Sequence, residues 1–260
     1  MLLLVGGHAR SGTTMLRHLC DSHREMAVTN ELNFLSGLGR SYAGHSRVLL
    51  RQVGQRTVKG IRWGHGVAPG ARAAGFAARY LWALGANDEG VVDVPAVERA
   101  LRTLFPQASV VGDKMPHYVL LLDRLADTPG LSSLVIYRDC RDVVSSFLER
   151  VRTVWKTHAW GRSFNAADKV AREWVRYVDL MERHRERILT VRYEDLVREP
   201  RPVLDRLAGA LEVDPAGFDA GRVASIQDSS VGKHANGLTR EELAVVMDIA
   251  GPAMARLGYA

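Results

Sequence analysis

The chain has 260 residues, and 47% of them are hydrophobic, enough for the core of one large α/β domain or two small ones. Its formal charge of +6 favours an anionic ligand, but the 35 basic residues are dispersed among 29 acidic ones, so we do not expect nucleic-acid binding. No apolar run reaches the roughly 18 residues of a membrane-spanning helix, and Met1 to Val5 lacks the basic start of a signal peptide. We therefore expect a cytoplasmic protein without an integral membrane segment. Cys20 and Cys140 are too few for a disulfide framework.

The N-terminal stretch predicts a strand, a loop and a helix. Leu2 to Val5 is a continuous apolar run, typical of a buried strand, and the glycine-containing loop 6–12 follows it. Glycines let backbone N–H groups approach an anion, and the helix that begins at Thr13 adds the positive end of its dipole. The hydroxyls of Ser11, Thr13 and Thr14 can also donate to phosphate oxygens. This segment therefore predicts a phosphate-binding loop.

The loop departs from the nucleoside-triphosphate pattern at one position. Gly7 and Gly12 have the spacing of G-x-x-x-x-G-K-[ST], but Thr13 stands where the phosphate-binding lysine belongs. The cation lies inside the loop as Arg10, whose permanently charged guanidinium can donate two parallel hydrogen bonds to an oxyanion. We expect an anion site without the usual contacts of a kinase or ATPase to the β- and γ-phosphates.

Strands and helices alternate along the rest of the chain. A short apolar stretch, 26–28, approaches Glu31, and 32–56 shows no clear pattern. Apolar strand runs follow at 109–112, 133–137 and 188–191. Helices are predicted over 13–20, 95–105 and 165–187, after Pro200, and from the capping box Thr239-x-x-Glu242 onward. This alternation predicts an α/β fold of three layers, in which helices flank a central, mainly parallel sheet.

Each of the three later strands ends in polar residues, and ligands of parallel sheets bind at these carboxyl ends. Asp113-Lys114 follows the first, Arg138-Asp139 the second and Arg192-Tyr193 the third. Arg138, together with the arginine- and serine-rich start of the next helix, predicts a second phosphate site. Two phosphate sites at neighbouring strand ends predict a bisphosphonucleotide as the ligand.

The motif Gly6-Gly7-x-x-Arg10-Ser11-Gly12-Thr13-Thr14 resembles the 5′-phosphosulfate-binding loop of sulfotransferases that use 3′-phosphoadenosine 5′-phosphosulfate (PAPS). It is most similar to the tyrosylprotein sulfotransferase branch and its bacterial relatives. The resemblance covers nearly the whole chain and implies a P-loop NTPase-like fold in a single sulfotransferase domain, 1–260. It implies PAPS as cosubstrate, adenosine 3′,5′-bisphosphate as product, and no metal. The acceptor-side excursion would lie within 32–105, where the aromatic residues of 62–89 form either an acceptor pocket or a satellite core.

The resemblance also implies two catalytic cations. Lys114, in Gly112-Asp113-Lys114-x-Pro116, matches the catalytic lysine of the family, although a salt bridge to Asp113 is the alternative. Arg10 is the second cation. Charge develops on the bridging and sulfuryl oxygens during sulfuryl transfer, and both side chains would stabilise it.

Glu31 is the expected base. It follows Arg10 by 21 positions, the separation of the catalytic glutamate from the loop arginine in the tyrosylprotein branch. A helix-capping or surface role is the alternative. Other sulfotransferases use a histidine base, so His65 and His117 are kept as further candidates.

The 3′-phosphate segment of the family ends its strand with an arginine and carries a serine eight residues later, which Arg138 and Ser146 match. Ion pairs of Arg138 with Asp139 or Asp142 are the alternative. His234 stands where relatives often carry a tryptophan, a departure on the adenine side. Tyr193 lies either beside the nucleotide or in the core. The implied cofactor-binding residues are Arg10, Ser11, Gly12, Thr13, Thr14, Arg138, Ser146, Arg150, Tyr193, Ser229, Ser230 and Lys233.

We therefore expect a sulfotransferase that moves the sulfuryl group of PAPS to a hydroxyl of a small-molecule, glycan or lipid acceptor by direct in-line transfer, as a monomer or homodimer. Two alternatives remain at this level. A small-molecule kinase with a P-loop would need Mg²⁺ and a lysine at position 13, where Thr13 stands. A non-catalytic nucleotide-binding module would keep Arg138 and Ser146 but lack a base.

Overall fold

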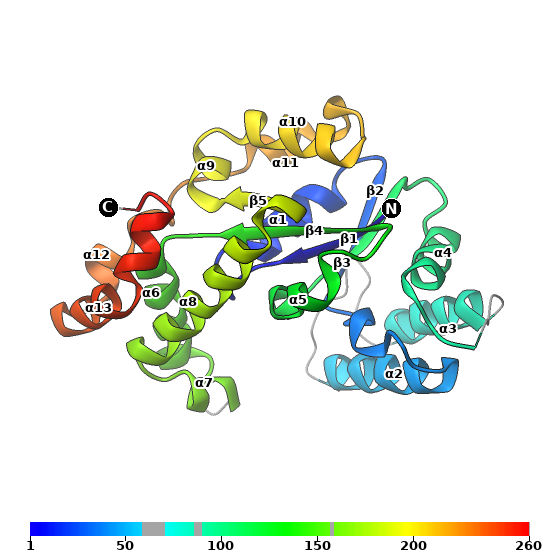
Figure 1. Cartoon of the computed structure of the whole chain (residues 1–260), viewed down its shortest axis with the longest axis horizontal. Coiled ribbons are helices and arrows are strands. Elements are labelled where there is room, and N and C mark those ends of the chain that lie inside the picture. The colour runs from blue at the N-terminus through cyan, green and yellow to red at the C-terminus, as the bar shows by residue number, and fades with distance from the viewer. Residues whose placement is uncertain (59–70, 86–89, 157–158, 260) are drawn as a thin grey trace.

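A parallel sheet lies at the centre of the protein (Figure 1). The computed structural model describes all residues except 59–70, 86–89, 157–158 and 260. In this part of the chain the sheet has five strands in the order β2-β3-β1-β4-β5, and each neighbouring pair runs parallel. The strands are β1 (Leu2–Gly6), β2 (Met26–Asn30), β3 (Val110–Lys114), β4 (Leu131–Tyr137) and β5 (Leu189–Arg192).

Helices cover both faces of the sheet, which explains why β1 is apolar at every position. On one face α1 (Thr13–Asp21), α9 (Tyr193–Arg198) and α10 (Pro200–Leu211) bury a cluster that includes Leu3 and Val5. On the other face α4 (Val94–Leu104) packs near the β2 edge, and α3 (Ala71–Gly85) and α2 (Tyr42–Val58) follow behind it. The protein is thus a three-layer α/β fold, as predicted.

The β4 side of this second face is covered by α8 (Ala167–Arg183), which packs on Val135. Behind it lie α6 (Cys140–Thr153) and α13 (Arg240–Arg256), joined to α8 in one apolar cluster around Trp174. The remaining short helices are α5 (Leu122–Leu125), α7 (Ala159–Ser163), α11 (Ala220–Ala224), α12 (His234–Gly237) and the 3₁₀ turns η1 (Phe34–Gly37), η2 (Pro116–Leu121), η3 (Arg185–Arg187) and η4 (Pro215–Gly217).

Most predicted elements are present, with corrections at their ends. The helix expected over 165–187 is α8, which ends before His184 because that residue leaves the helical conformation at φ −106°, ψ 13°. The stretch 26–28 is part of a complete strand, β2, and the unpatterned stretch 32–56 contains most of α2. The capping box of Thr239 and Glu242 is present at the start of α13.

The excursion 62–89 is only partly described. Its α3 buries Tyr80 and Phe76 against the core, which favours the satellite-core interpretation for these two aromatic residues. His65 and Trp63 lie outside the described residues. Cys20 and Cys140 are buried free thiols. Within the described ranges, no helix combines the length and apolar character needed to span a membrane.

Candidate active site at the carboxyl edge of the sheet

The strand order places the predicted residues in a row. Because all five strands are parallel, their carboxyl ends meet at one edge. Along this edge lie Glu31 after β2, Lys114 at the end of β3, the loop 7–12 after β1, Arg138 after β4 and Tyr193 after β5. The register pairs Lys114 with both Asn30 and Val5, so the lysine lies between the strand that leads to Glu31 and the strand that leads to the loop.

The loop after β1 has the backbone of an anion site. Gly12 caps α1 at φ 93°, and no side chain caps the N–H groups of the first helical turn. Arg10 also adopts a left-handed conformation, φ 74°, which costs a non-glycine residue about 1–2 kcal/mol. Backbone strain like that of Arg10 persists where surrounding contacts hold it, commonly at functional sites. At the start of α1, Thr13 is buried, whereas Thr14 is exposed.

Ser11 lies differently from the expected phosphate-facing position. It is fully buried, and its N–H donates to the carbonyl of His8 at 3.1 Å. Its hydroxyl lies at a small internal cavity lined also by Trp174 and Tyr177, and has no hydrogen-bond partner among the described residues. Of the loop hydroxyls, those of Thr13 and Thr14 at the helix start are the better placed for an anion.

Glu31 and Lys114 form an ion pair. The Nζ of Lys114 donates to Oε1 of Glu31 at 2.7 Å, and the N–H of Glu31 donates to the carbonyl of Lys114, also at 2.7 Å. The lysine side chain is 2% exposed and the glutamate side chain 27% exposed. The alternative expected from the sequence, a salt bridge of Lys114 to Asp113, is wrong in its partner, because the lysine pairs with the candidate base. A partly open carboxylate beside a buried ammonium can meet a hydroxyl from solvent.

The turn that carries Glu31 is fixed by Asp113. Glu31 and Asn33 have φ values of 56° and 57°. The buried carboxylate of Asp113 accepts hydrogen bonds from the N–H groups of Leu32 and Asn33, both at 3.0 Å. It also accepts from the hydroxyls of Thr29 at 2.8 Å and Tyr118 at 2.5 Å. Burial raises the pKa of this carboxyl, and the four hydrogen bonds oppose that effect.

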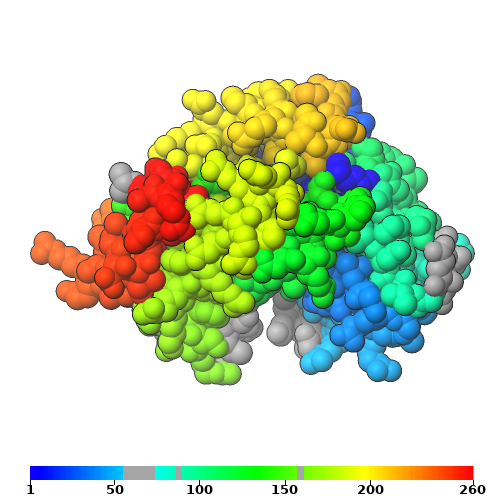
Figure 2. All heavy atoms as spheres, viewed as in Figure 1, coloured from blue at the N-terminus to red at the C-terminus, as the bar shows by residue number. Residues whose placement is uncertain are grey.

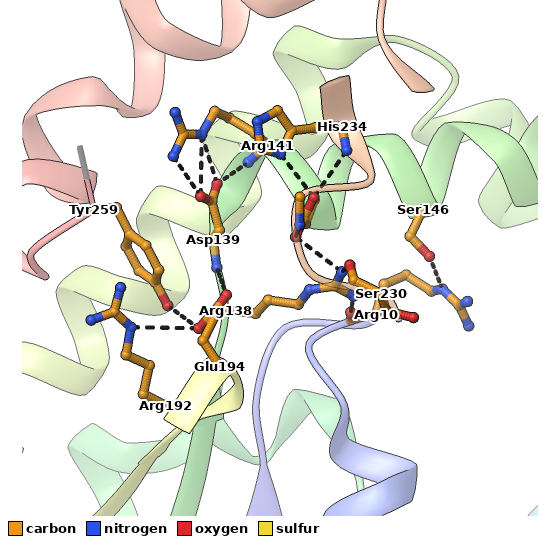
Figure 3. Close-up of polar contacts among 12 residues, drawn as sticks. Arg10, Arg138, Asp139, Arg141, Ser146, Arg192, Glu194, Ser230, His234 and Tyr259 are labelled. Carbon is orange, nitrogen blue, oxygen red and sulfur yellow. Dashed lines mark hydrogen bonds and ion pairs between the residues drawn. The ribbon is translucent and has the colours of Figure 1, made fainter. Parts of the chain in front are cut away.

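Arg138 follows β4, on the other side of the loop 7–12 from Lys114. Figure 3 shows its surroundings. Its guanidinium stacks over the ring of Tyr193 at 4.5 Å and pairs with the carboxylate of Asp142 at 3.2 Å. It also donates to the carbonyls of Arg10, at 3.3 Å, and Ser230. The predicted ion pair with Asp142 is thus real, whereas Asp139 pairs with Arg141. Nε of Arg138 is buried and has no hydrogen-bond partner within the described ranges.

Positive charge is concentrated between the loop and α6. Nε of Arg10 donates to the hydroxyl of Ser146 at 3.0 Å, so the first and second phosphate-binding segments touch (Figure 3). Desolvation lowers the pKa of Arg10, and the positive charges of Arg150 and Arg138 lower it further. A group of cations that repel one another is stabilised by a bound anion.

The carboxylate of Asp142 on α6 holds the segment 229–234 beside this cluster. It accepts hydrogen bonds from the N–H groups of Gly232 and His234 and from Nδ1 of His234, at 2.9, 3.0 and 2.8 Å. Burial would raise the pKa of Asp142, but these hydrogen bonds and the charge of Arg138 outweigh it and lower the pKa. His234, which departs from the tryptophan of the relatives, therefore anchors the segment that carries Ser229, Ser230 and Lys233.

Tyr193 has a structural role at the site. Its ring is buried against Gly12, where a Cβ would lie 2.6 Å from Cδ2 of the tyrosine. It thus supports both the loop and Arg138. His117, the further base candidate, lies on η2; burial lowers its pKa, and the charges of Glu173 and Glu31 oppose that effect.

A cavity of about 350 Å³ adjoins the start of α1. It lies between α1 and the stretch that runs from α11 to Gln227, and this size suits a planar base of a nucleotide. Apart from Thr14, its lining was not predicted from the sequence, because the other residues form no motif and meet only in the fold. The lining residues are Thr14, Met15, His18, Leu19, Arg222, Ser225, Ile226 and Gln227.

Comparisons with known proteins agree with this geometry. A family model described as the sulfotransferase family matches residues 3–216. The sulfotransferase domain from the curacin biosynthetic pathway aligns with a TM-score of 0.58 and 18% identity, covering 100% of this chain and 98% of that domain. A sulfotransferase from Alicyclobacillus acidocaldarius has a TM-score of 0.54 and 17% identity, with 98% and 93% covered. A mouse sulfotransferase complexed with PAP (TM-score 0.50, 11% identity) has 98% and 84% covered. The search of curated proteins gave no match.

Proposed function

The chain belongs to the sulfotransferase family, and we propose that it transfers the sulfuryl group of PAPS directly to a hydroxyl of its acceptor. The observation that carries this proposal is the row of side chains at the sheet edge. A carboxylate and a buried ammonium lie on one side of the anion-binding loop, and a buried arginine lies on the other. The first pair suits proton and sulfuryl transfer, and the arginine suits a phosphate.

The nucleotide end fits a bisphosphonucleotide. The start of α1 offers N–H groups without a side-chain cap for the 5′ end, and Arg138 and Ser146 offer donors for the 3′-phosphate. The cavity beside Thr14 is the place we assign to the adenine ring. The repulsion between Arg10, Arg138 and Arg150 supports this fit, since two phosphate groups would neutralise it. A related mouse enzyme was solved with PAP.

In the proposed reaction Glu31 accepts the proton of the acceptor hydroxyl while the hydroxyl oxygen bonds to sulfur. The bond between sulfur and the bridging phosphate oxygen breaks, and Lys114 and Arg10 stabilise the negative charge on that oxygen and on the sulfuryl group. Lys114 touches Glu31, so the cation lies beside the base at the place where the acceptor hydroxyl and the sulfuryl group would meet. Glu31 follows Arg10 at the separation found in the tyrosylprotein branch, and this spacing supports membership of that branch.

Nucleotide binding tests the proposal against the kinase alternative. We expect adenosine 3′,5′-bisphosphate at 100 times its Kd to stabilise the protein by about 2.7 kcal/mol, and Mg-ATP to have little effect. Since 1 kcal/mol corresponds to about 2–4 °C at this chain length, the thermal midpoint should rise by about 5–10 °C. The reverse ranking of the two ligands would favour a kinase, despite Thr13 in the lysine position.

A further inference from the structure

The segment 32–87 has an unusual charge. It contains seven arginines and one lysine but neither aspartate nor glutamate. Its formal charge of +8 exceeds the +6 of the whole chain, so the remaining residues are slightly acidic in sum. The net positive charge of the chain is therefore accounted for by this one segment, which lies outside the nucleotide-binding motifs.

The described arginines of this segment are exposed and uncompensated. Arg47 and Arg51 lie on α2 and Arg79 lies on α3, and none of the three pairs with a described carboxylate. Some exposed arginines elsewhere have such partners, at 2.8–3.0 Å: Arg183 with Asp123, Arg187 with Asp127 and Arg256 with Asp179. What distinguishes the segment 32–87 is that it contains no acidic residue at all, and exposed cations in such a segment favour an anionic partner.

The same helices expose apolar side chains. Trp82 on α3 is 72% exposed and Leu50 on α2 is 53% exposed. Apart from Arg79, the rest of the exposed side of α3 carries the small residues Ala74, Gly75 and Ala78, while its other side is packed in the core around Tyr80. An exposed helix side with one charge and otherwise apolar or small residues favours a covering partner. The two helices adjoin, because the Tyr42 hydroxyl donates to the carbonyl of Leu81 at 3.0 Å.

We propose that the basic-apolar face, defined as Arg47, Leu50, Arg51, Arg79 and Trp82, docks on an anionic lipid bilayer. Arginines near a surface are attracted to anionic head groups, and tryptophan prefers the boundary between head groups and acyl chains. A two-fold contact between copies of the chain would bring the same cations against this face, so a symmetric dimer does not account for it. In the space-filling view α2 projects from the lower edge of the molecule (Figure 2).

The position of this face relative to the site points to the acceptor. Gln52 on α2 donates to the carbonyl of Glu31 at 3.4 Å, so the docking helix also contacts the turn of the candidate base. Docking would bring the bilayer to the acceptor side of the site. This step rests on the proposed function. Of the small-molecule, glycan and lipid acceptors that the sequence leaves open, it favours a lipid with a hydroxyl-bearing head group.

Sedimentation with lipid vesicles tests the docking without any nucleotide. The full chain should bind vesicles of phosphatidylglycerol and phosphatidylcholine, bind vesicles of phosphatidylcholine alone weakly, and be released by high salt. The double variant Arg47→Glu, Arg51→Glu should lose at least about 30-fold in partition, since each lost arginine removes about 1 kcal/mol and each added glutamate is repelled. The double variant Arg198→Glu, Arg206→Glu has the same change of charge on α9 and α10 and should bind like the wild type. Trp82→Ala should weaken binding to the anionic vesicles at low salt, because it removes apolar contact without changing the charge.

Equal binding to both kinds of vesicle, or to neither, would overturn the docking proposal, as would an equal loss in the α9–α10 control variant. Binding of the face to an acidic protein with no affinity for either vesicle would also overturn it, in favour of a protein partner. Because this assay uses no PAPS, failure of docking with intact sulfuryl transfer refutes the bilayer alone. Failure of transfer with intact docking refutes the proposed reaction alone.

Discussion

Asp113→Asn tests whether the buried carboxylate positions the candidate base. One carboxylate oxygen accepts from Thr29 and Leu32, and the other from Asn33 and Tyr118. In the asparagine variant the first oxygen remains, and an NH₂ group replaces the second. The hydroxyl of Tyr118 can rotate and accept a hydrogen bond from this NH₂ group, whereas the N–H of Asn33 can only donate and loses its acceptor. Loss of one hydrogen bond to a buried charge costs about 1.5–3 kcal/mol. For this chain length the thermal midpoint should fall by about 3–12 °C.

The catalytic effect should be larger than the effect on binding. Without the hydrogen bond from Asn33, the left-handed backbone of Glu31 can relax. A displacement of the Glu31 carboxylate by about 1 Å can cost on the order of 100-fold in rate. We expect kcat to fall about 100-fold in steady-state assays while the KM for PAPS stays unchanged, because the nucleotide end of the site is separate. Tyr118→Phe, which leaves both turn N–H bonds in place, should keep most of kcat. A normal kcat in Asp113→Asn, despite a lower thermal midpoint, would refute the positioning role.

Three further changes probe the nucleotide end. Ser146→Ala removes a partner of Arg10 and should lower the calorimetric affinity for adenosine 3′,5′-bisphosphate about tenfold but not that for adenosine 5′-monophosphate; equal losses would contradict the assignment. Gly12→Ala places a Cβ 2.6 Å from Tyr193 at φ 93°, so urea unfolding should show a loss of about 2 kcal/mol or more, and an unchanged stability would rule out this packing. The lowered pKa of Asp142 gives stability that is present above its unfolded pKa, about 3.9, and lost as pH falls through the folded value. The stability difference between wild type and Asp142→Asn should therefore shrink below about pH 4, and a difference that grows there would reverse the sign of the shift.

Local sequence pattern predicted the strands and the loop because their information is local. The run Leu2 to Val5 is apolar throughout since helices cover both faces of β1, and Gly12 marks the backbone that only glycine adopts easily. The parallel sheet followed from the alternation of such runs with helical periodicity, and its three-layer arrangement is confirmed.

Other features depend on contacts between distant parts of the chain. The pairing of Asn30 with Lys114 brings Glu31 to the lysine, and no local pattern contains that register. The edge strand β2 was interpreted only as an apolar approach, since its partner β3 lies far along the chain. The link from Asp142 to His234 is equally remote, and pattern reasoning treated this histidine only as a departure from the relatives.

Transfer of labelled sulfate tests the central proposal most directly. The wild type and Glu31→Gln would each be incubated with PAPS labelled in its sulfuryl group and with fractionated cell extract that includes the lipid fraction. We expect the wild type to form a labelled acceptor and adenosine 3′,5′-bisphosphate in equal amounts, and Glu31→Gln to bind the nucleotide normally but to lose transfer by about 100-fold or more, within the range for general-base catalysis. Undiminished transfer by Glu31→Gln would contradict the role of Glu31, and no labelled product with the wild type would contradict the proposed reaction.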